Sequence, residues 1–236
     1  MPMTPENLVT QLQGVYGSAL ESMLLYGSAV AGEHLSKRSD YNVLVVLDSV
    51  PFDRLSAIGA VFRSWGEAGN PPPMIFTAAE WRSSADVFPM EYADILERHQ
   101  VLYGPDVTEG ISVARSNLRL EVEQQALGKL LHLRRAAMAA GDDAREQLKL
   151  LEASLSTIMV IFRGVVRLHG DIPSQDYSAL SGQVGQLAGF DLAPVSRIIE
   201  HVRGTARIEK KDAASVLAGY LGEMEALVAH LDGYSA

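Results

Sequence analysis

Two short polar segments beside predicted strands contain the residues with the clearest capacity for chemistry. The first is Gly27-Ser28, which follows an apolar run over 22–26, and the second holds Asp40 and Asn42 at the start of another apolar run. Gly27 allows the backbone to approach a ligand closely. Ser28 adds a hydroxyl where we expect a short helix to begin, and the free N–H groups at a helix N-terminus bind phosphate. Gly27 and Ser28 are therefore the candidate nucleotide-binding residues.

Asp40 and Asn42 are the candidate metal ligands. Residues two apart on a strand point to the same face of a sheet, and Mg²⁺ prefers oxygen ligands. A divalent cation that faces a phosphate-binding turn is typical of phosphoryl and nucleotidyl transfer. We therefore expect Mg²⁺ to enter with a nucleoside triphosphate and Asp40 to be catalytic. A glycine-serine turn or a strand-initial aspartate alone is more often structural, so the prediction depends on the combination.

Apolar runs that alternate with helical patterns predict a sheet with flanking helices in the first part of the chain. Thr4 is placed to cap a helix that has Pro5 at its first position. The predicted strands cover 22–26, 41–47, 74–77 and 101–103, and further helices are predicted over 54–65 and 91–98.

Helical periodicity dominates after the turn-forming segment 103–106. Helices are predicted over 118–138, over 148–165 with an end at Gly170, after a cap at Asp191, and over 217–231. These patterns predict two domains, 1–106 and 107–236, of which the second is a bundle of four or five helices.

The combination of Gly27-Ser28 with the segment Ser39-Asp40-Tyr41-Asn42 resembles the signature of the DNA polymerase β-like nucleotidyltransferase superfamily, over residues 22–47. Residues 92–104 are similar to the end of the catalytic domain in bacterial small-substrate members. The helical second half is similar to the bundle of antibiotic-modifying members. The resemblance implies an α+β nucleotidyltransferase domain, with a small mixed sheet and flanking helices, followed by an all-α helical bundle. It also implies transfer of a nucleoside monophosphate to a hydroxyl group of a small molecule.

The resemblance implies a further catalytic residue in the helical half. In antibiotic-modifying members a glutamate of the helical domain can act as general base on the acceptor hydroxyl, and the matching candidate here is Glu121. The alternative is that Glu121 is a solvated acid in the first turn of a helix.

The sequence departs from the family pattern in its carboxylates. Asn42 stands where the family has its second metal-binding acid, and the predicted strand 74–77 contains no acid to supply the third. Two divalent cations are costly to bring together without charged oxygens, so we expect one nucleotide-bound Mg²⁺ and weak or absent transfer, unless Glu91 or Asp94 folds back to compensate. The alternative is a catalytically degenerate module that binds a nucleotide or, like an antitoxin, a protein partner.

The charge and cysteine content of the chain limit the classes of molecule that it is expected to bind. The chain has 29 acidic and 20 basic side chains, a net charge of −9, which argues against broad binding to nucleic acid. Residues 1–104 hold 12 acidic and 6 basic side chains, a balance that favours a small cationic acceptor. The absence of cysteine excludes disulfides, thiolate zinc sites and a cysteine nucleophile. Without a signal peptide or a long apolar run, we expect a cytoplasmic protein with no membrane partner, and a homodimer is a candidate assembly.

Overall fold

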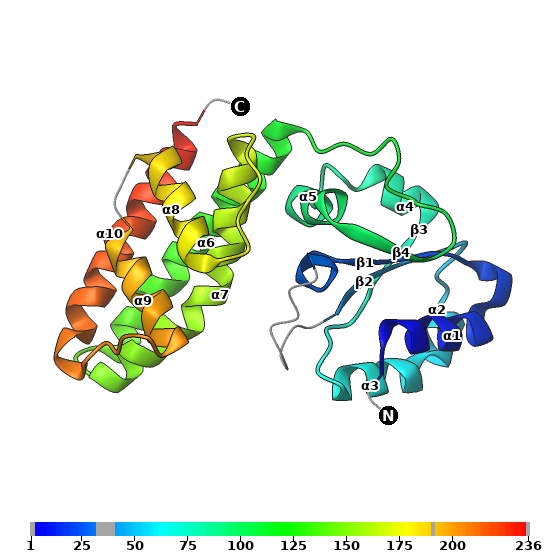
Figure 1. Cartoon of the computed structure of the whole chain (residues 1–236), viewed down its shortest axis with the longest axis horizontal. Coiled ribbons are helices and arrows are strands. Elements are labelled where there is room, and N and C mark those ends of the chain that lie inside the picture. The colour runs from blue at the N-terminus through cyan, green and yellow to red at the C-terminus, as the bar shows by residue number, and fades with distance from the viewer. Residues whose placement is uncertain (1–2, 32–40, 190–191, 235–236) are drawn as a thin grey trace. The chain divides into compact units, whose positions relative to one another are not determined.

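The computed structural model describes residues 3–31, 41–189 and 192–234, without the side chains of Ser28 and Ala31. Residue contacts divide the chain into two compact units, Met1–Val113 and Ala114–Ala236. Each unit has its own set of elements, and each is described separately below (Figure 1).

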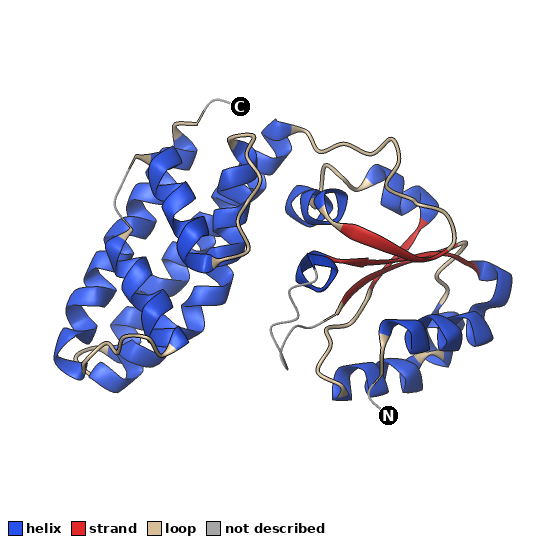
Figure 2. Cartoon of the chain, viewed as in Figure 1, coloured by secondary structure: helices blue, strands red, loops and turns tan. Residues whose placement is uncertain are grey.

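The first unit contains a four-stranded mixed sheet, as predicted. Its strands are β1 (Leu20–Tyr26), β2 (Asn42–Leu47), β3 (Met74–Thr77) and β4 (His99–Tyr103), in the order β3-β2-β1-β4. Strand β1 is antiparallel to both β2 and β4, whereas β2 and β3 are parallel (Figure 2). The two central strands β1 and β2 are therefore covered on both edges, which agrees with their nearly continuous apolar sequences.

Helices cover both faces of this sheet (Figure 1). On one side lie α1 (Pro5–Tyr16), α2 (Phe52–Ala57) and α3 (Gly59–Glu67), and on the other lie α4 (Ala78–Ser83) and α5 (Pro89–Glu97). Two short 3₁₀ helices, η1 (Gly17–Ala19) and η2 (Gly27–Ala31), precede and follow β1.

Alternation along β2 divides the core of the first unit into two clusters. Val43, Val45 and Leu47 pack in a cluster with α1 and α3 residues, whereas Leu44 and Val46 pack with Trp81, Tyr92 and Ile95 of α4 and α5. This division follows from the period of two along a strand.

Local sequence signals explain the start of α1 but did not indicate the break between α2 and α3. The Thr4 side chain accepts a hydrogen bond from the backbone N–H of Asn7 at 3.3 Å, which confirms the predicted cap of α1. The helical character predicted over 54–65 is confirmed, but it is divided at Ile58 (φ −95°, ψ 4°) into the two helices α2 and α3. Ile58 is buried in the core, and residues 52–57 before it contain no proline or glycine that would have marked the break.

The second unit is helical in all the elements described. It contains α6 (Arg115–Ala140), α7 (Ala144–Leu168), α8 (Tyr177–Ala188), α9 (Ala193–Arg203) and α10 (Ala213–Asp232), with a 3₁₀ turn η3 (Lys210–Asp212). Helix α8 was not predicted, although Leu180, Val184 and Leu187 recur at helical spacing and Asp176 caps the helix by accepting from the N–H of Ala179. Asp191, the predicted cap of the next helix, lies outside the described residues. Across the described parts of the chain, no helix combines the length and apolar character needed to cross a bilayer.

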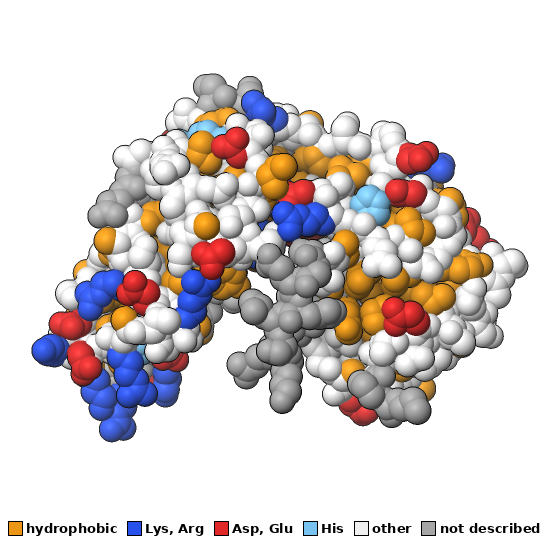
Figure 3. Space-filling view, in the orientation of Figure 1, with side chains coloured by type: hydrophobic (Ala, Val, Ile, Leu, Met, Phe, Trp, Pro, Cys, Tyr) orange, Lys and Arg blue, Asp and Glu red, His pale blue; other side chains and the backbone are white. Residues whose placement is uncertain are grey.

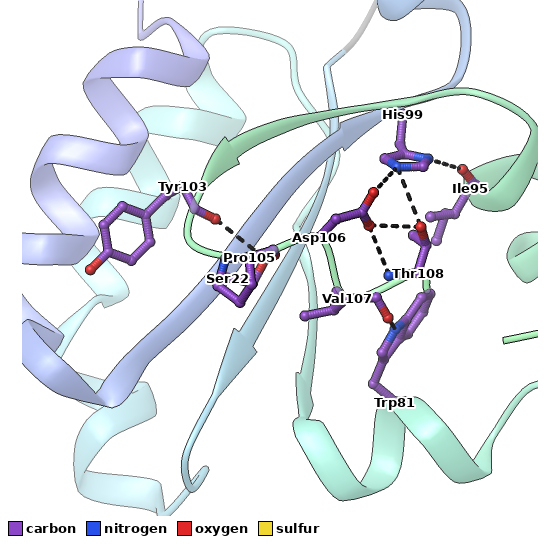
Figure 4. A network of polar contacts seen from close by, with 9 residues as sticks. All are labelled: Ser22, Trp81, Ile95, His99, Tyr103, Pro105, Asp106, Val107 and Thr108. Carbon is purple, nitrogen blue, oxygen red and sulfur yellow. Dashed lines mark hydrogen bonds and ion pairs between the residues drawn. The ribbon is translucent and has the colours of Figure 1, made fainter. Parts of the chain in front are cut away.

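The segment after β4 packs on the first unit. The sequence analysis ended the first domain at residue 106, whereas the two units meet between Val113 and Ala114. The Ser22 hydroxyl donates to the carbonyl of Pro105 at 2.8 Å, and the indole N–H of Trp81 donates to the carbonyl of Val107 at 2.8 Å (Figure 4). Val107, Ile111 and Val113 then pack against the Trp81 cluster. Residues 107–113, which we assigned to the helical domain, are therefore held by contacts in the first unit.

Candidate functional site

The predicted glycine and asparagine meet at one end of the sheet. In the strand register Tyr26, the last residue of β1, pairs with Asn42 at the start of β2 and with His99 at the start of β4. Gly27 follows directly with φ +78°, a value that favours glycine, and a Cβ at this position would lie 3.4 Å from Nδ2 of Asn42. Its N–H donates to the carbonyl of Arg98 at 3.4 Å. The turn after β1 is therefore fixed directly beside the Asn42 amide.

The remaining predicted residues of this site are described only in part. Ser28 lies in η2, so the short helix expected after Gly27 is a five-residue 3₁₀ helix. The Ser28 side chain and the whole of Asp40 lie outside the described residues. The predicted placement of Asp40 and Asn42 on one face thus remains a prediction.

Asn42 and Tyr26 belong to the sheet face that α5 covers. Asn42 is two residues before Leu44, and Tyr26 is two residues after Leu24, and both leucines are buried in the cluster with Tyr92 and Ile95 of α5. Successive residues of a strand alternate between faces. The side chains of Tyr26 and Asn42 therefore lie on the side of the sheet where α5 packs.

The charges of two acids of α5, Glu91 and Asp94, reach the Tyr26 hydroxyl at this end of the sheet. The Tyr26 hydroxyl donates to Sδ of Met74 at 3.2 Å. Burial, the largest cause, and the charges of Asp94 and Glu91 together raise the pKa of Tyr26 to about 12. Both carboxylates are thus close enough to Tyr26 for their charges to matter, and Tyr26 keeps its proton at neutral pH.

Glu91 has an oxygen without a partner. Its Oε2 atom is buried and makes no hydrogen bond. A buried carboxylate oxygen without a donor or cation is costly, and such groups in folded proteins are nearly always paired. Among the parts of the chain that are described, no three His, Asp or Glu side chains gather closely enough to hold a metal ion. Among the described residues, Glu91 thus offers a free buried oxygen on the sheet face where Asn42 lies, without a complete set of metal ligands.

The sequence analysis found these features unevenly. Gly27 and Asn42 were named as site residues, and Glu91 and Asp94 only as acids that could compensate for missing carboxylates. Tyr26 was read only as the last residue of a buried strand. The spacing of three residues between Glu91 and Asp94, which places both on one side of a helix, is the signal that could have linked them.

A polar network beside this site has a structural role. His99 Nε2 lies 3.1 Å from Oδ2 of Asp106, and His99 Nδ1 lies 2.9 Å from the carbonyl of Ile95 (Figure 4). Thr108 donates its backbone N–H (2.9 Å) and its hydroxyl (2.7 Å) to Oδ1 of Asp106. The Thr108 hydrogen bonds are the main cause that lowers the pKa of Asp106 to about 2. The network joins the start of β4 to the segment that follows the strand.

Glu121, the candidate general base, is half-buried on α6. Its neighbour Arg119 pairs with Glu123 at 2.9 Å and donates to the backbone carbonyls of Leu231 (3.2 Å) and Asp232 (3.1 Å) at the end of α10. Arg119 is thus occupied within the helical unit, and the role of Glu121 remains a prediction.

The second unit has a cavity of about 480 Å³ that includes none of the predicted site residues. Its lining contains Glu152, His201, Arg207, Lys210 and Lys211. His201 donates from Nε2 to Glu152 at 3.0 Å and accepts the N–H of Ile208 at Nδ1 (3.1 Å), so both ring nitrogens have structural partners. Figure 3 shows that Lys and Arg side chains gather at one end of this unit, at the lower left of the view.

Comparisons with solved structures find similar chains, whereas comparisons of the sequence find none. No family model matches the chain, and no curated protein matches its sequence. The structure is similar to that of the spectinomycin adenyltransferase AAD(9) from Enterococcus faecialis, solved with ATP and spectinomycin, with a TM-score of 0.59. The sequences are 14% identical, and the match covers 93% of this chain and 97% of the other. The chain therefore has the fold of a nucleotidyltransferase with a helical second unit, as the resemblance of residues 22–47 implied.

Proposed function

We propose that the chain binds a nucleoside triphosphate with Mg²⁺ at the end of the sheet formed by Gly27 and Asn42, and transfers a nucleoside monophosphate to a hydroxyl group of a small molecule. The observation that carries the proposal is the position of Gly27 beside Asn42: a Cβ at residue 27 would lie 3.4 Å from Nδ2 of Asn42. The fold that contains this turn is similar to that of an adenyltransferase. A glycine turn beside a side chain that carries an amide oxygen suits a phosphate group and the cation that accompanies it.

Each residue of the site has a proposed task. Gly27 and Ser28 bind the phosphates, and Asp40 and Asn42 supply oxygens to the Mg²⁺ that accompanies them. When bound, this ion neutralises negative charge on the phosphates. The acceptor hydroxyl attacks the α-phosphorus in line, the bond from that phosphorus to the bridging oxygen breaks, and pyrophosphate leaves. Glu121 is our candidate for the group that takes the proton of the hydroxyl.

Glu91 would supply a negative charge that the motif of Asp40 and Asn42 lacks. Asn42 offers a neutral amide oxygen, so the motif brings one charge, from Asp40, where the family pattern brings two. The buried and unpartnered Oε2 of Glu91 and the neighbouring charge of Asp94 add negative potential on the sheet face where Asn42 lies. The donor chemistry of these side chains fits a hard divalent cation.

The acceptor that fits this unit is a small, cationic molecule with a hydroxyl group. The acidic balance of residues 1–104, 12 acids against 6 bases, attracts cations and opposes polyanions. The structural neighbour was solved with the small molecule spectinomycin, which supports an acceptor of that size.

A second candidate function is nucleotide binding, or antitoxin-like binding of a protein partner, without transfer. Asn42 in place of the second metal-binding acid of the family pattern favours it. The two candidates differ in whether the bound nucleotide reacts.

One assay separates these functions. The wild-type chain, Asn42→Asp and Asp40→Ala are incubated with ATP labelled at the α-phosphate, with Mg²⁺ or Mn²⁺ and a panel of cationic hydroxyl compounds. Nucleotide binding is measured in parallel by equilibrium dialysis. The proposal expects transfer by the wild type and none by Asp40→Ala. Binding without wild-type transfer, or transfer only by Asn42→Asp, supports the second candidate. No nucleotide binding by the wild type contradicts the nucleotide site in both.

A further inference from the structure

Helix α6 carries apolar side chains on two faces. One face is buried in the helical unit by five residues, Leu118, Val122, Ala126, Leu130 and Leu133. The other face carries four exposed side chains, namely Leu120 (60% exposed), Leu127 (43%), Leu131 (41%) and Met138 (77%). At about 100° per residue these four lie within an arc of about 40° on one side of the helix. Figure 1 shows α6 as a long helix of the second unit.

These four residues belong to a regular seam. Adding Gln124 and Arg134, which lie on the same side, gives positions 120, 124, 127, 131, 134 and 138. The steps alternate between four and three residues, which is the spacing of the a and d positions of a coiled coil. The seam extends over about 27 Å of helix at 1.5 Å per residue.

We propose that this seam is the interface of an antiparallel homodimer, in which α6 packs against α6 of a second copy. The spacing is symmetric about position 129, so a two-fold axis at that point pairs each residue with a complementary one. Leu120 packs against the partner's Met138, and Leu127 packs against the partner's Leu131. An isologous contact of this kind closes after two copies.

The polar residues of the seam select the antiparallel direction. In this direction Gln124 faces the partner's Arg134, so an amide oxygen can accept from a guanidinium. In a parallel pair Arg134 would face the partner's Arg134, and two like charges would meet in the seam. Arg134 is half-exposed and already pairs with Glu225 of α10 at 2.8 Å, so its charge enters the interface partly neutralised.

Large exposed apolar stripes of this kind mark interaction surfaces rather than chance. Every a and d seam with alternating steps of four and three reads the same in both directions, so the spacing permits any antiparallel helix as a partner. The matched positions of Gln124 and Arg134 about residue 129 are the feature that favours a second copy over an unrelated protein or another part of the same chain.

Cysteine cross-linking tests the direction directly, because the chain contains no cysteine. The variants Leu120→Cys and Met138→Cys are oxidised separately and as a mixture, and separated without reductant. The proposal expects a disulfide-linked dimer in the mixture and none in either variant alone. In the antiparallel pair like positions lie about 27 Å apart along the helix, far beyond the roughly 7 Å limit between Cα atoms of a disulfide. Cross-linking of either variant with itself would indicate a parallel pair and overturn the proposal.

Sedimentation equilibrium tests whether the pair forms without cross-linking. The wild type is expected to dimerise, and the double variant Leu127→Glu, Leu131→Glu is expected to raise the dissociation constant at least about 100-fold, because it places four carboxylates in the central layers. Val160→Glu, at a half-exposed apolar position of α7, is the matched control and should leave the dimer intact. A monomeric wild type, or a dimer that the double variant does not weaken, would overturn the proposal, whether another part of the chain or another protein covers the seam.

Discussion

The two faces of the four-stranded sheet are built from the same strands but have different compositions. On the α1 and α3 face, Val43, Val45 and Leu47 pack in an extended aliphatic cluster with Trp65. On the α4 and α5 face the cluster is smaller, and four aliphatic residues pack there with Trp81, which is stacked on Tyr92 at 4.1 Å. The second face also includes the polar end of the sheet, where the charges of Asp94 and Glu91 help to raise the pKa of Tyr26.

The difference shows how one strand can serve both stability and function. The odd-numbered residues of β2 are buried on the first face, and the even-numbered residues begin with Asn42 and continue into the second core. The aliphatic face can be weakened without changing the site, whereas changes at the polar end should alter ligand binding with little effect on stability. The predictions below test this separation, from the largest effect to the smallest.

The largest effect is expected from Trp65→Ala on the aliphatic face. Trp65 is fully buried, and its indole N–H donates to the carbonyl of Pro71 at 2.7 Å. Truncation of a buried tryptophan costs about 3–5 kcal/mol of unfolding free energy. Chemical denaturation measures the loss, and Phe52→Ala, at a position that is 83% exposed, should change stability by less than about 0.5 kcal/mol. A comparable loss in both variants would contradict the assigned core.

The turn after β4 should be the next most sensitive position. Gly104 has φ +73°, and a Cβ there would lie 2.0 Å from the carbonyl oxygen of Glu21. We expect Gly104→Ala to cost about 2–3 kcal/mol through backbone strain and overpacking. Gly66→Ala in α3, where nothing lies within 4 Å of the new Cβ, should instead stabilise the protein by about 0.5–1 kcal/mol. Equal unfolding free energies for the two variants would be incompatible with this turn geometry.

Charge changes at the polar end should alter cation binding in opposite directions. Asn42→Asp adds a carboxylate and should tighten Mg²⁺ binding in the presence of ATP by about tenfold, or about 1.4 kcal/mol. Glu91→Gln removes a charge and should weaken it by a similar factor. Isothermal titration calorimetry measures both.

The matched control is Glu6→Gln, because Glu6 is an exposed acid of α1 on the opposite side of the sheet. It should leave the Mg²⁺ affinity unchanged. If Glu6→Gln and Glu91→Gln weakened binding equally, the cation would respond only to net charge.

The smallest effect concerns acid stability. The pKa of Asp106 is about 2 in the folded chain, against an ordinary value of 3.8. A carboxyl group whose folded pKa is depressed stabilises the protein above its unfolded pKa, and this contribution is lost as the pH falls toward the folded pKa. Between pH 4 and pH 2 the Tm of the wild type should therefore fall more steeply than that of Asp106→Asn, in thermal unfolding followed by circular dichroism. Parallel Tm curves for the two proteins would show that the Thr108 and His99 contacts do not stabilise the carboxylate.

The sequence predicted those parts of the fold whose signals are local. The apolar run 41–47 indicated β2 because a buried strand needs no polar alternation, and Thr4 and Pro5 indicated the start of α1 because their roles depend on adjacent residues. The break at Ile58 was missed, because an apolar residue between two helical segments gives no local stop signal. Helix α8 was missed although its signals are local, namely the Asp176 cap and the spacing of Leu180 and Val184.

The candidate site was predictable to the same extent. Gly27 and Asn42 were recognised from their spacing, and the register of β1 and β2 places them together. The proximity of Glu91 and Asp94 to Tyr26 depends on the path of the chain through β3, α4 and α5, which local patterns do not determine. The anchoring of residues 107–113 was missed for the same reason, because Trp81 and Ser22 are distant in sequence from the carbonyls that they bind.

The most direct test of the nucleotide site is paramagnetic broadening of backbone amide signals by Mn²⁺ added together with ATP. The account predicts that the signals of Gly27, Asn42 and Glu91 broaden first, and that they recover when EDTA removes the ion. The signals of Arg207 and Lys210, which line the cavity of about 480 Å³ in the second unit, should stay sharp. Broadening confined to the second unit, or no ATP-dependent broadening at Gly27 and Asn42, would contradict the central claim.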